Sequence, residues 1–429
     1  MNRIHFLLFS ILIFLQLLIS NCLQAQSLKY LQISGQITSK TTQEPLAFAH
    51  IGLQNNNIGS VTNIEGNFVF KIPVSKQNDS LQISYLGYEK YSMSLKEVDF
   101  NQFLKIELTP FDISLATIEV RADGALGILK EALKKIPENY PTEVVMTDAF
   151  YREQLLENEK FVILSEAVCE VRKSPYGFKY SKKSEEDQVR ILKARKGEGL
   201  IDPEIAPFVI NGGPTNGLES DILRNPDGPF EAKNFKYYDF ELTNITTYNG
   251  HEVYIIDFDQ KEEVKKSLFS GKIFIEVASL AIVTVEAGLS EKGLEYHKIP
   301  GLANRLILKV MGIQYTPIQM RYKIDYKKYG NKWYLHYTNN RFVFKLIRSK
   351  KGLTSIIDAN ADFLVTAVFP EKAVVNFSEE ETFGSKDVLS QELGEYDAEF
   401  WKDYNVILPD EELKENVKKL DKNKSKTID

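Results

Sequence analysis

Apolar and polar residues alternate with a period of two through much of the chain, beginning near residue 33. The clearest segment places three large apolar residues at alternate positions: Phe68, Phe70 and Ile72. Turn residues such as Asn, Gly and Pro separate this segment from similar ones on either side, up to residue 88. Short alternating strands at this density are typical of two sheets that share one core. We therefore expect residues 27–110 to form a β-sandwich.

A longer series of alternating segments begins near residue 240, and three tight-turn signals divide it into hairpins: Asn249-Gly250, Ala278-Ser279 and Gly330-Asn331. In the later hairpins one face is apolar and aromatic, with Tyr322, Ile324, Tyr326 and Trp333, and the other face is charged. This pattern predicts an antiparallel sheet that is covered on one side. An amphipathic helix is predicted to pack against the sheet, from the spacing of Leu126, Leu129, Leu133 and Ile136.

The predicted fold class is thus mainly β, with an N-terminal β-sandwich followed by an α+β domain that contains a curved antiparallel sheet at residues 124–404. Residues 174–229 are polar and rich in charge, Gly and Pro, so we expect a loop-rich insertion there, either a long excursion or a segment with short helices. Residues 111–123 are expected to form a linker strand. Residues 405–429 are expected to form a charged C-terminal tail.

The first 25 residues have the pattern of a cleaved export signal. Arg3 precedes an apolar core at residues 6–19, which is shorter than the roughly 20 residues of a membrane-spanning helix. Ala25 is the expected last residue of this signal peptide. Cys22 leaves a second possibility, lipidation after cleavage just before it, although Asn21 is larger than the residue that the bacterial lipobox has there. A retained anchor helix is a further alternative.

Several residues of the first domain resemble the carboxypeptidase regulatory-like family, a transthyretin-like (prealbumin-like) β-sandwich. The resemblance rests on Gly35, Pro45-Leu46, Gly59, Thr62, Glu65-Gly66, Phe68 and the ending Ser84-Tyr85-Leu86-Gly87-Tyr88. The family implies an accessory domain without zinc ligands. In exported proteins of Gram-negative bacteria it often precedes an outer-membrane receptor, and residues 115–122 look like the strand that begins such receptors.

The helix followed by a meander of hairpins is similar in architecture to the half-barrel of periplasmic lipoprotein carriers. This resemblance implies a curved sheet whose apolar concave side can hold acyl chains. The alternative is that Tyr322, Tyr326, Trp333 and Tyr337 form a solid core. An integral outer-membrane barrel fits less well, because residues 174–229 and 292–300 interrupt the strands.

The sequence offers no residues that we assign to catalysis, cofactor binding or metal binding. His50, His251, His297 and His336 are isolated, and no zinc motif or nucleophile elbow is present. The turn from Asn63 to Gly66 is too short for a calcium loop and is expected to be a hairpin turn. Cys169 lies in an apolar strand pattern that is typical of inert packing.

These observations predict a non-catalytic exported envelope protein. It would be a binding or assembly module in the periplasm, or peripheral to the outer membrane, with a protein, glycan or lipid partner. The formal net charge of −6 argues against nucleic acid as a partner. The alternative is an uncharacterised hydrolase carried by the second domain.

Overall fold

The computed structural model describes residues 30–54, 56–111, 124–177, 186–197, 201–224, 228–299, 301–391, 401 and 404–410. The predicted signal peptide with Cys22, most of the linker strand and residues 411–429 of the tail lie outside the described residues. Among the helices within the described ranges, none has the length and apolar character that crossing a membrane requires.

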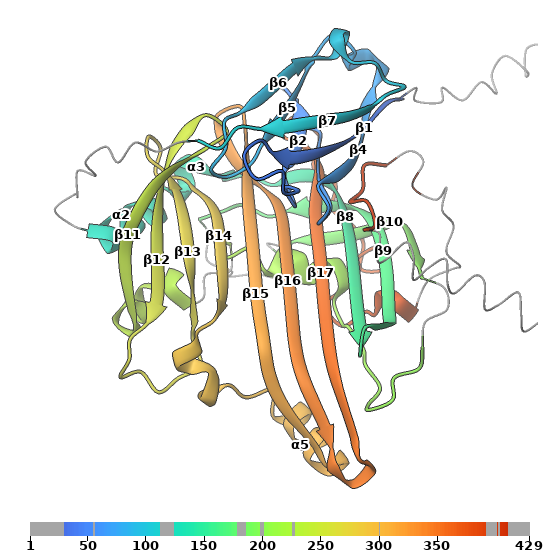
Figure 1. The fold of residues 1–429 in the computed structure, drawn as a ribbon, viewed down its shortest axis with the longest axis vertical. Coiled ribbons are helices and arrows are strands. Elements are labelled where there is room, and N and C mark those ends of the chain that lie inside the picture. Colours follow the sequence, from blue (N-terminus) through green and yellow to red (C-terminus); the bar gives the residue numbers. More distant parts are fainter. Residues whose placement is uncertain are drawn as a thin grey trace, which may run out of the picture.

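The N-terminal part is a sandwich of two small sheets (Figure 1). One sheet has the order β4-β1-β7, with the bounds β1 Tyr30–Ser39, β4 Asn67–Pro73 and β7 Phe103–Leu108. The other has the order β3-β2-β5-β6, with β2 His50–Leu53, β3 Gly59–Val61, β5 Ser80–Ser84 and β6 Tyr91–Ser94. The apolar residues of both sheets form one buried core, as the alternation predicted, and Phe68, Phe70 and Ile72 belong to it.

The turn from Asn63 to Gly66 differs from the hairpin turn that the sequence predicted. It connects β3 in one sheet to β4 in the other, so its flanking strands do not pair with each other. The Asn63 side chain accepts hydrogen bonds from the backbone N–H groups of Glu65 and Asn67, at 3.1 and 2.9 Å. Gly66 has a φ of 73°, and a Cβ there would lie 2.4 Å from the carbonyl oxygen of Ile37. Glycine is therefore required at this crossing.

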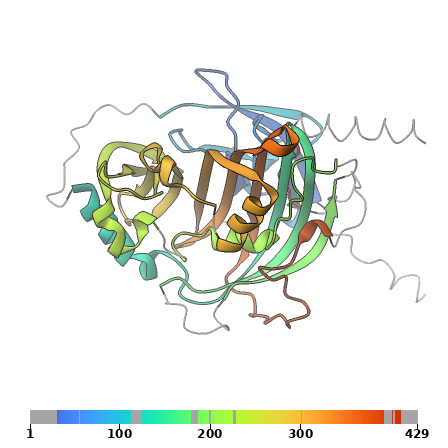
Figure 2. The same cartoon turned by 90° about the horizontal axis from the view of Figure 1, so that it is seen from below.

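The larger part is one antiparallel sheet of ten strands in the order β10-β9-β8-β17-β16-β15-β14-β13-β12-β11. Its strands are β8 Val145–Glu157, β9 Lys160–Lys173, β10 Gln188–Lys196, β11 Tyr238–Tyr248, β12 His251–Gln260, β13 Phe269–Glu276, β14 Ile282–Leu289, β15 Ile313–Tyr329, β16 Lys332–Arg348 and β17 Leu353–Phe369. The three predicted tight turns connect β11 to β12, β13 to β14 and β15 to β16. The sheet curls around the helices, as Figure 2 shows from the end of the strands.

The described residues contain four α-helices: α2 Gly124–Lys134, α3 Ile136–Asn139, α4 Gly213–Glu219 and α5 Leu302–Met311. The predicted amphipathic helix is α2, which packs against β11. Its buried stripe is shifted from the predicted one, because Ala125, Ile128, Leu129 and Ala132 are the buried residues. The leucines at 126 and 133 lie at the margins of this face.

The predicted loop-rich insertion contains both regular structure and loops. Residues 188–196 form β10, which pairs with β9 at one edge of the large sheet. A β-bulge between Ile191 and Lys193 shifts the register, so the alternation in this charged segment is interrupted. Within the insertion, the Gly/Pro-rich residues 211–217 contain the start of α4, which agrees with the alternative of a segment with short helices, and Pro214 occupies the first turn of this helix.

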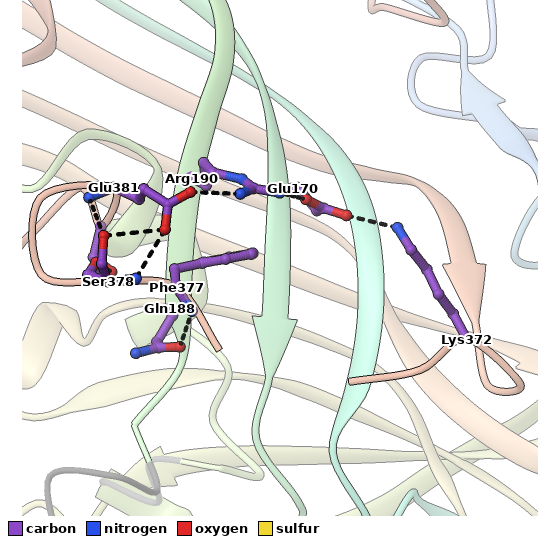
Figure 3. Close-up of polar contacts among 8 residues, drawn as sticks. Glu170, Gln188, Arg190, Lys372, Phe377, Ser378 and Glu381 are labelled. Carbon is purple, nitrogen blue, oxygen red and sulfur yellow. Dashed lines mark hydrogen bonds and ion pairs between the residues drawn. The ribbon is translucent and has the colours of Figure 1, made fainter. Parts of the chain in front are cut away.

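The C-terminal segment holds the sandwich and the outer face of the large sheet together. Residues 405–410, expected to belong to a tail, are packed between the two parts: Asn405 bonds to the backbone of Lys71, and the carbonyl of Ile407 accepts from Arg152 at 2.7 Å. Figure 3 shows the preceding residues, 372–381, fastened to β9 and β10. There Glu170 bonds to both Lys372 and Arg190, and Arg190 also bonds to Glu381.

Candidate functional site

The concave side of the large sheet borders a half-open cavity of about 550 Å³. Ligand pockets typically measure about 300–1,000 Å³ and are mostly apolar. The sheet contributes apolar and aromatic side chains from seven strands: Tyr151, Phe258, Phe269, Val285, Ala287, Tyr322, Ile324, Phe342, Ala359 and Ala361. The opposite wall is the cover, defined as residues 205–224 and 228–230, which contains α4 and the short 3-10 helix η4 Gly228–Phe230.

Small residues opposite large ones explain why the space remains open. Ala361 pairs with Asn340 across the β16–β17 ladder, and Ala359 pairs with Phe342. Ala287 pairs with Tyr322 across β14 and β15. Because alanine has only a Cβ, these positions leave volume that the neighbouring rings do not fill. The Tyr322 ring is held in place on both sides, by Phe269 and by Phe342, each with ring centroids 5.4 Å away.

The aromatic face predicted from the sequence is partly cavity lining and partly solid core. Tyr322 and Ile324 line the cavity. Tyr326 and Trp333 are fully buried in the adjoining core and do not line it. The same alternating face is therefore solid near the turn at Gly330 and hollow further along the strands.

The cover is fixed to the sheet by a buried polar network centred on Asp221. The carboxylate of Asp221 accepts hydrogen bonds from the hydroxyls of Tyr176 and Tyr326, at 2.6 and 2.7 Å, and forms an ion pair with Lys173 at 3.1 Å. Burial and the nearby charge of Asp221 raise the pKa of both tyrosines well above 10, so both hydroxyls remain donors. A buried carboxylate with these partners holds one geometry, because breaking the set would leave a buried charge uncompensated.

One polar side chain of the cavity keeps an unused acceptor. Asn340 is 7% exposed, and its Nδ2 donates to Ser220 Oγ at 2.7 Å. Ser220 Oγ in turn donates to the carbonyl of Asn216 at 2.8 Å, which fixes the amide orientation of Asn340. Asn340 Oδ1 is buried without a hydrogen-bond partner. A bound molecule with an O–H or N–H group at this point would satisfy this acceptor.

The histidines that are isolated in sequence are not all isolated in space. His50 of β2 and His336 of β16 lie with ring centroids 4.5 Å apart, where the sandwich meets the large sheet. His50 also contacts Asp325 Oδ2 at 3.2 Å and the Tyr248 hydroxyl at 2.6 Å. No histidine lines the cavity, and within the described residues no group of three potential ligands could hold a metal ion.

Cys169 is buried, as the sequence predicted, and its thiol lies 3.7 Å from the carbonyl oxygen of Ala149. Burial raises the pKa of this thiol, followed by a smaller effect of Asp148. A thiol that stays protonated is a poor nucleophile. Cys169 is therefore a packing residue of the core.

Comparison with known proteins identifies the N-terminal domain. A family model described as a CarboxypepD_reg-like domain matches residues 33–120, in agreement with the resemblance seen in the sequence. The match covers about a fifth of the chain, so it identifies this domain and does not assign the remainder. No curated protein matches the chain in sequence.

Three solved structures are similar to the chain over a larger part of its length. A LolA superfamily protein from Nitrosomonas europaea is 12% identical and has a TM-score of 0.20, with 59% of this chain and 98% of that chain covered. A DUF1329 family protein from Desulfovibrio piger is 10% identical with a TM-score of 0.23, covering 60% and 98%. Lipovitellin, in a structure titled for its lipid–protein interactions, is 9% identical with a TM-score of 0.27, covering 63% and 29%. At these scores no argument rests on the matches.

Proposed function

We propose that this chain is a non-catalytic binding protein of the cell envelope, which holds an apolar ligand with a long alkyl chain in its concave cavity. The observation that carries the proposal is the cavity of about 550 Å³, lined mainly by apolar and aromatic side chains. The cover supports it, because the network around Asp221 fixes the wall opposite the sheet. A glycan suits the lining less well, since its many hydroxyls would find few polar partners.

The unused acceptor of Asn340 adds a preference among apolar ligands. A long-chain alcohol or amide can donate a hydrogen bond to Asn340 Oδ1, whereas an ionised carboxylate can only accept one. The expected ligand therefore carries an alkyl chain and a neutral donor group. Its chain would lie along Tyr322, Ile324 and Phe342.

The envelope location rests on the pattern of the first 25 residues. We expect export followed by cleavage after Ala25, and mass spectrometry of the mature N-terminus would identify the cleaved bond. A mature chain that begins with a lipid-modified Cys22 would instead make the protein a membrane-anchored lipoprotein. A chain that keeps Met1 would contradict cleavage.

The alternative of a hydrolase has little support at this cavity. Hydrolysis of an ester or glycoside generally uses two groups that act as acid, base or nucleophile. Among the described residues that line the cavity, Glu219 is the single carboxylate, and none is His, Cys or Asp. Ser220 also lines the cavity, but its hydroxyl is bonded to the Asn216 carbonyl and the Asn340 amide rather than to a base.

Filling the cavity tests the proposal. Ala361→Phe places a ring in the space between Asn340 and Phe342, whereas Thr354→Phe adds the same ring at an exposed position of the same strand. The apolar fluorophore N-phenylnaphthylamine would report binding, with long-chain alcohols and fatty acids as competitors. We expect Ala361→Phe to weaken binding by about tenfold or more and Thr354→Phe to leave it unchanged. Equal binding by both folded variants would contradict a ligand in this cavity.

A further inference from the structure

Helix α5 presents apolar side chains to solvent. Leu302, Leu306, Ile307 and Val310 are all more than half exposed, and Val310 is 86% exposed. On the opposite side of the helix, Leu308 and Met311 pack against a cluster at the end of the long strands. The helix is thus anchored by one face while its other apolar face lacks a protein partner among the described residues. Exposed apolar patches of this kind mark interaction surfaces.

Positive charge accompanies this apolar face. Arg305 and Lys309 are exposed on the same helix, and Lys350 and Lys351 are exposed at the neighbouring turn between β16 and β17. Lys350 lies close to the C-terminal end of α5, since a Cβ at Gly312 would be 3.9 Å from its Cδ. The two segments at this end of the long strands, residues 301–317 and 345–357, contain six Lys and Arg residues and no acidic residue. This region is strongly basic in a chain whose net charge is negative.

Acidic side chains do occur at the adjoining end of β8 and β9. Glu159, Asp202 and Glu204 are exposed there. Glu157 is buried and accepts hydrogen bonds from the backbone N–H groups of Glu204 and Ile205. Any attraction for an anionic surface is therefore local to α5 and to the lysines of the β16–β17 turn.

The position of α5 in the fold relates this surface to the cavity. Figure 1 shows the helix at the end of the long strands that lies away from the sandwich. The cluster beneath α5 contains Tyr315 and Phe344, whose rings are 5.3 Å apart. Phe344 lies two residues from Phe342, on the same side of β16, and Phe342 lines the cavity. An apolar path therefore runs along the concave face from α5 to the cavity.

We propose that α5 is a docking element for an anionic phospholipid surface, with Leu302, Leu306, Ile307 and Val310 entering the interface and Arg305, Lys309, Lys350 and Lys351 contacting lipid headgroups. An amphipathic helix with an apolar face and a basic rim lies in the plane of such an interface. Basic residues near an anionic surface strengthen this binding. If α5 docks in this way, the apolar path that leads from α5 to the cavity would face the lipid. This docking proposal goes beyond the proposed ligand binding, and the two proposals can be tested independently of each other.

Flotation of the full chain with lipid vesicles tests the proposal. Val310→Glu places a charge on the outermost apolar position, and its matched control is Val374→Glu, another exposed valine remote in sequence from α5. Vesicles of phosphatidylglycerol and phosphatidylcholine in equal parts are compared with vesicles of phosphatidylcholine alone. We expect the protein to float with the mixed vesicles, Val310→Glu to lower its partitioning by about tenfold or more, and Val374→Glu to behave as the unmodified chain. Because the apolar N-terminal segment is common to all variants, the difference between them reports α5.

A second pair of variants separates charge from apolar insertion. Lys309→Gln and Lys350→Gln should each lower partitioning into the mixed vesicles by about fivefold, and added salt should reduce this difference. Binding of N-phenylnaphthylamine should stay unchanged in Val310→Glu, because position 310 lies outside the cavity lining. Equal flotation of Val310→Glu and the unmodified chain would overturn the proposal. The proposal would also be overturned if the chain did not bind vesicles but self-associated, and Val310→Glu abolished this self-association. In that case α5 would be a contact between two copies of the chain.

Discussion

At the scale of single residues, one buried carboxylate lies two positions along β8 from Tyr151, a residue that lines the cavity. Glu153 of β8 is fully buried, and its Oε2 accepts a hydrogen bond from the Tyr151 hydroxyl at 3.1 Å. Ser165, which pairs with Glu153 across β8 and β9, is the other hydroxyl close to this carboxylate. Burial raises the pKa of Glu153 to about 7. The folded protein therefore holds this proton at pH values where the unfolded chain has released it.

Replacing this carboxylate should stabilise the protein in a pH-dependent way. Since the folded pKa of about 7 exceeds the ordinary 4.5, the free energy of unfolding should decrease as pH rises from 4.5 to 7. Glu153→Gln stays neutral, so it should raise the free energy of unfolding by about 1–3 kcal/mol above pH 7 and change it little near pH 4.5. Urea denaturation at both pH values measures the difference. Glu159→Gln, at an exposed position, is the control, and an equal gain at both pH values would contradict this account.

At the scale of elements, alternation and turn residues were sufficient to predict most of the sheet. The Asn249-Gly250 turn has φ values of 53° and 82°, the left-handed conformations that these two residues favour in tight hairpins. The strands β10 and β17 were not predicted, and in β10 a bulge breaks the alternation among charged residues. Tyr322 and Ile324 were assigned to the right face by their spacing. The cover was not predictable, because contacts such as that of Ser220 with Asn340 join residues 120 positions apart.

The sandwich core offers a quantitative test of an element that the sequence did predict. Phe68 of β4 is 1% exposed and belongs to the shared core of both sheets. Phe68→Ala should lower the free energy of unfolding by about 3–5 kcal/mol, because it removes buried apolar surface and leaves a cavity. Phe103 of β7 is 54% exposed in the same sandwich, so Phe103→Ala is the matched control and should have a much smaller effect. A nearly neutral Phe68→Ala in chemical denaturation would contradict its position in the core.

At the scale of the whole molecule, the sandwich is docked on the large sheet through polar as well as apolar contacts. Phe48 stacks on Tyr337 with ring centroids 5.2 Å apart, and the Gly87 N–H donates to the Thr247 carbonyl at 2.9 Å. His50 and His336 meet in the buried part of this interface, beside Lys327. Burial lowers the pKa of Lys327 from 10.5 to about 8, so this lysine still carries a charge at neutral pH. Of the charged groups that contact His50, Asp325 is the one that favours its protonation.

The docking of the two parts should therefore weaken in mild acid. Burial lowers the pKa of both His50 and His336 below 6.5, so a histidine released from the interface takes up a proton that the docked one excludes. The contribution of these histidines to docking is full above pH 6.5 and is lost as the pH falls below it. Relative to the intrinsic exchange rate, which itself falls as the pH is lowered, hydrogen exchange at the amide of Gly87 should accelerate on acidification. His336→Gln should remove much of this acceleration. His297→Gln changes a histidine that bonds to Ser267 and Tyr315, away from the sandwich, and should leave it intact. The same acceleration in His336→Gln and the unmodified chain would show that protonation of His336 does not govern the docking.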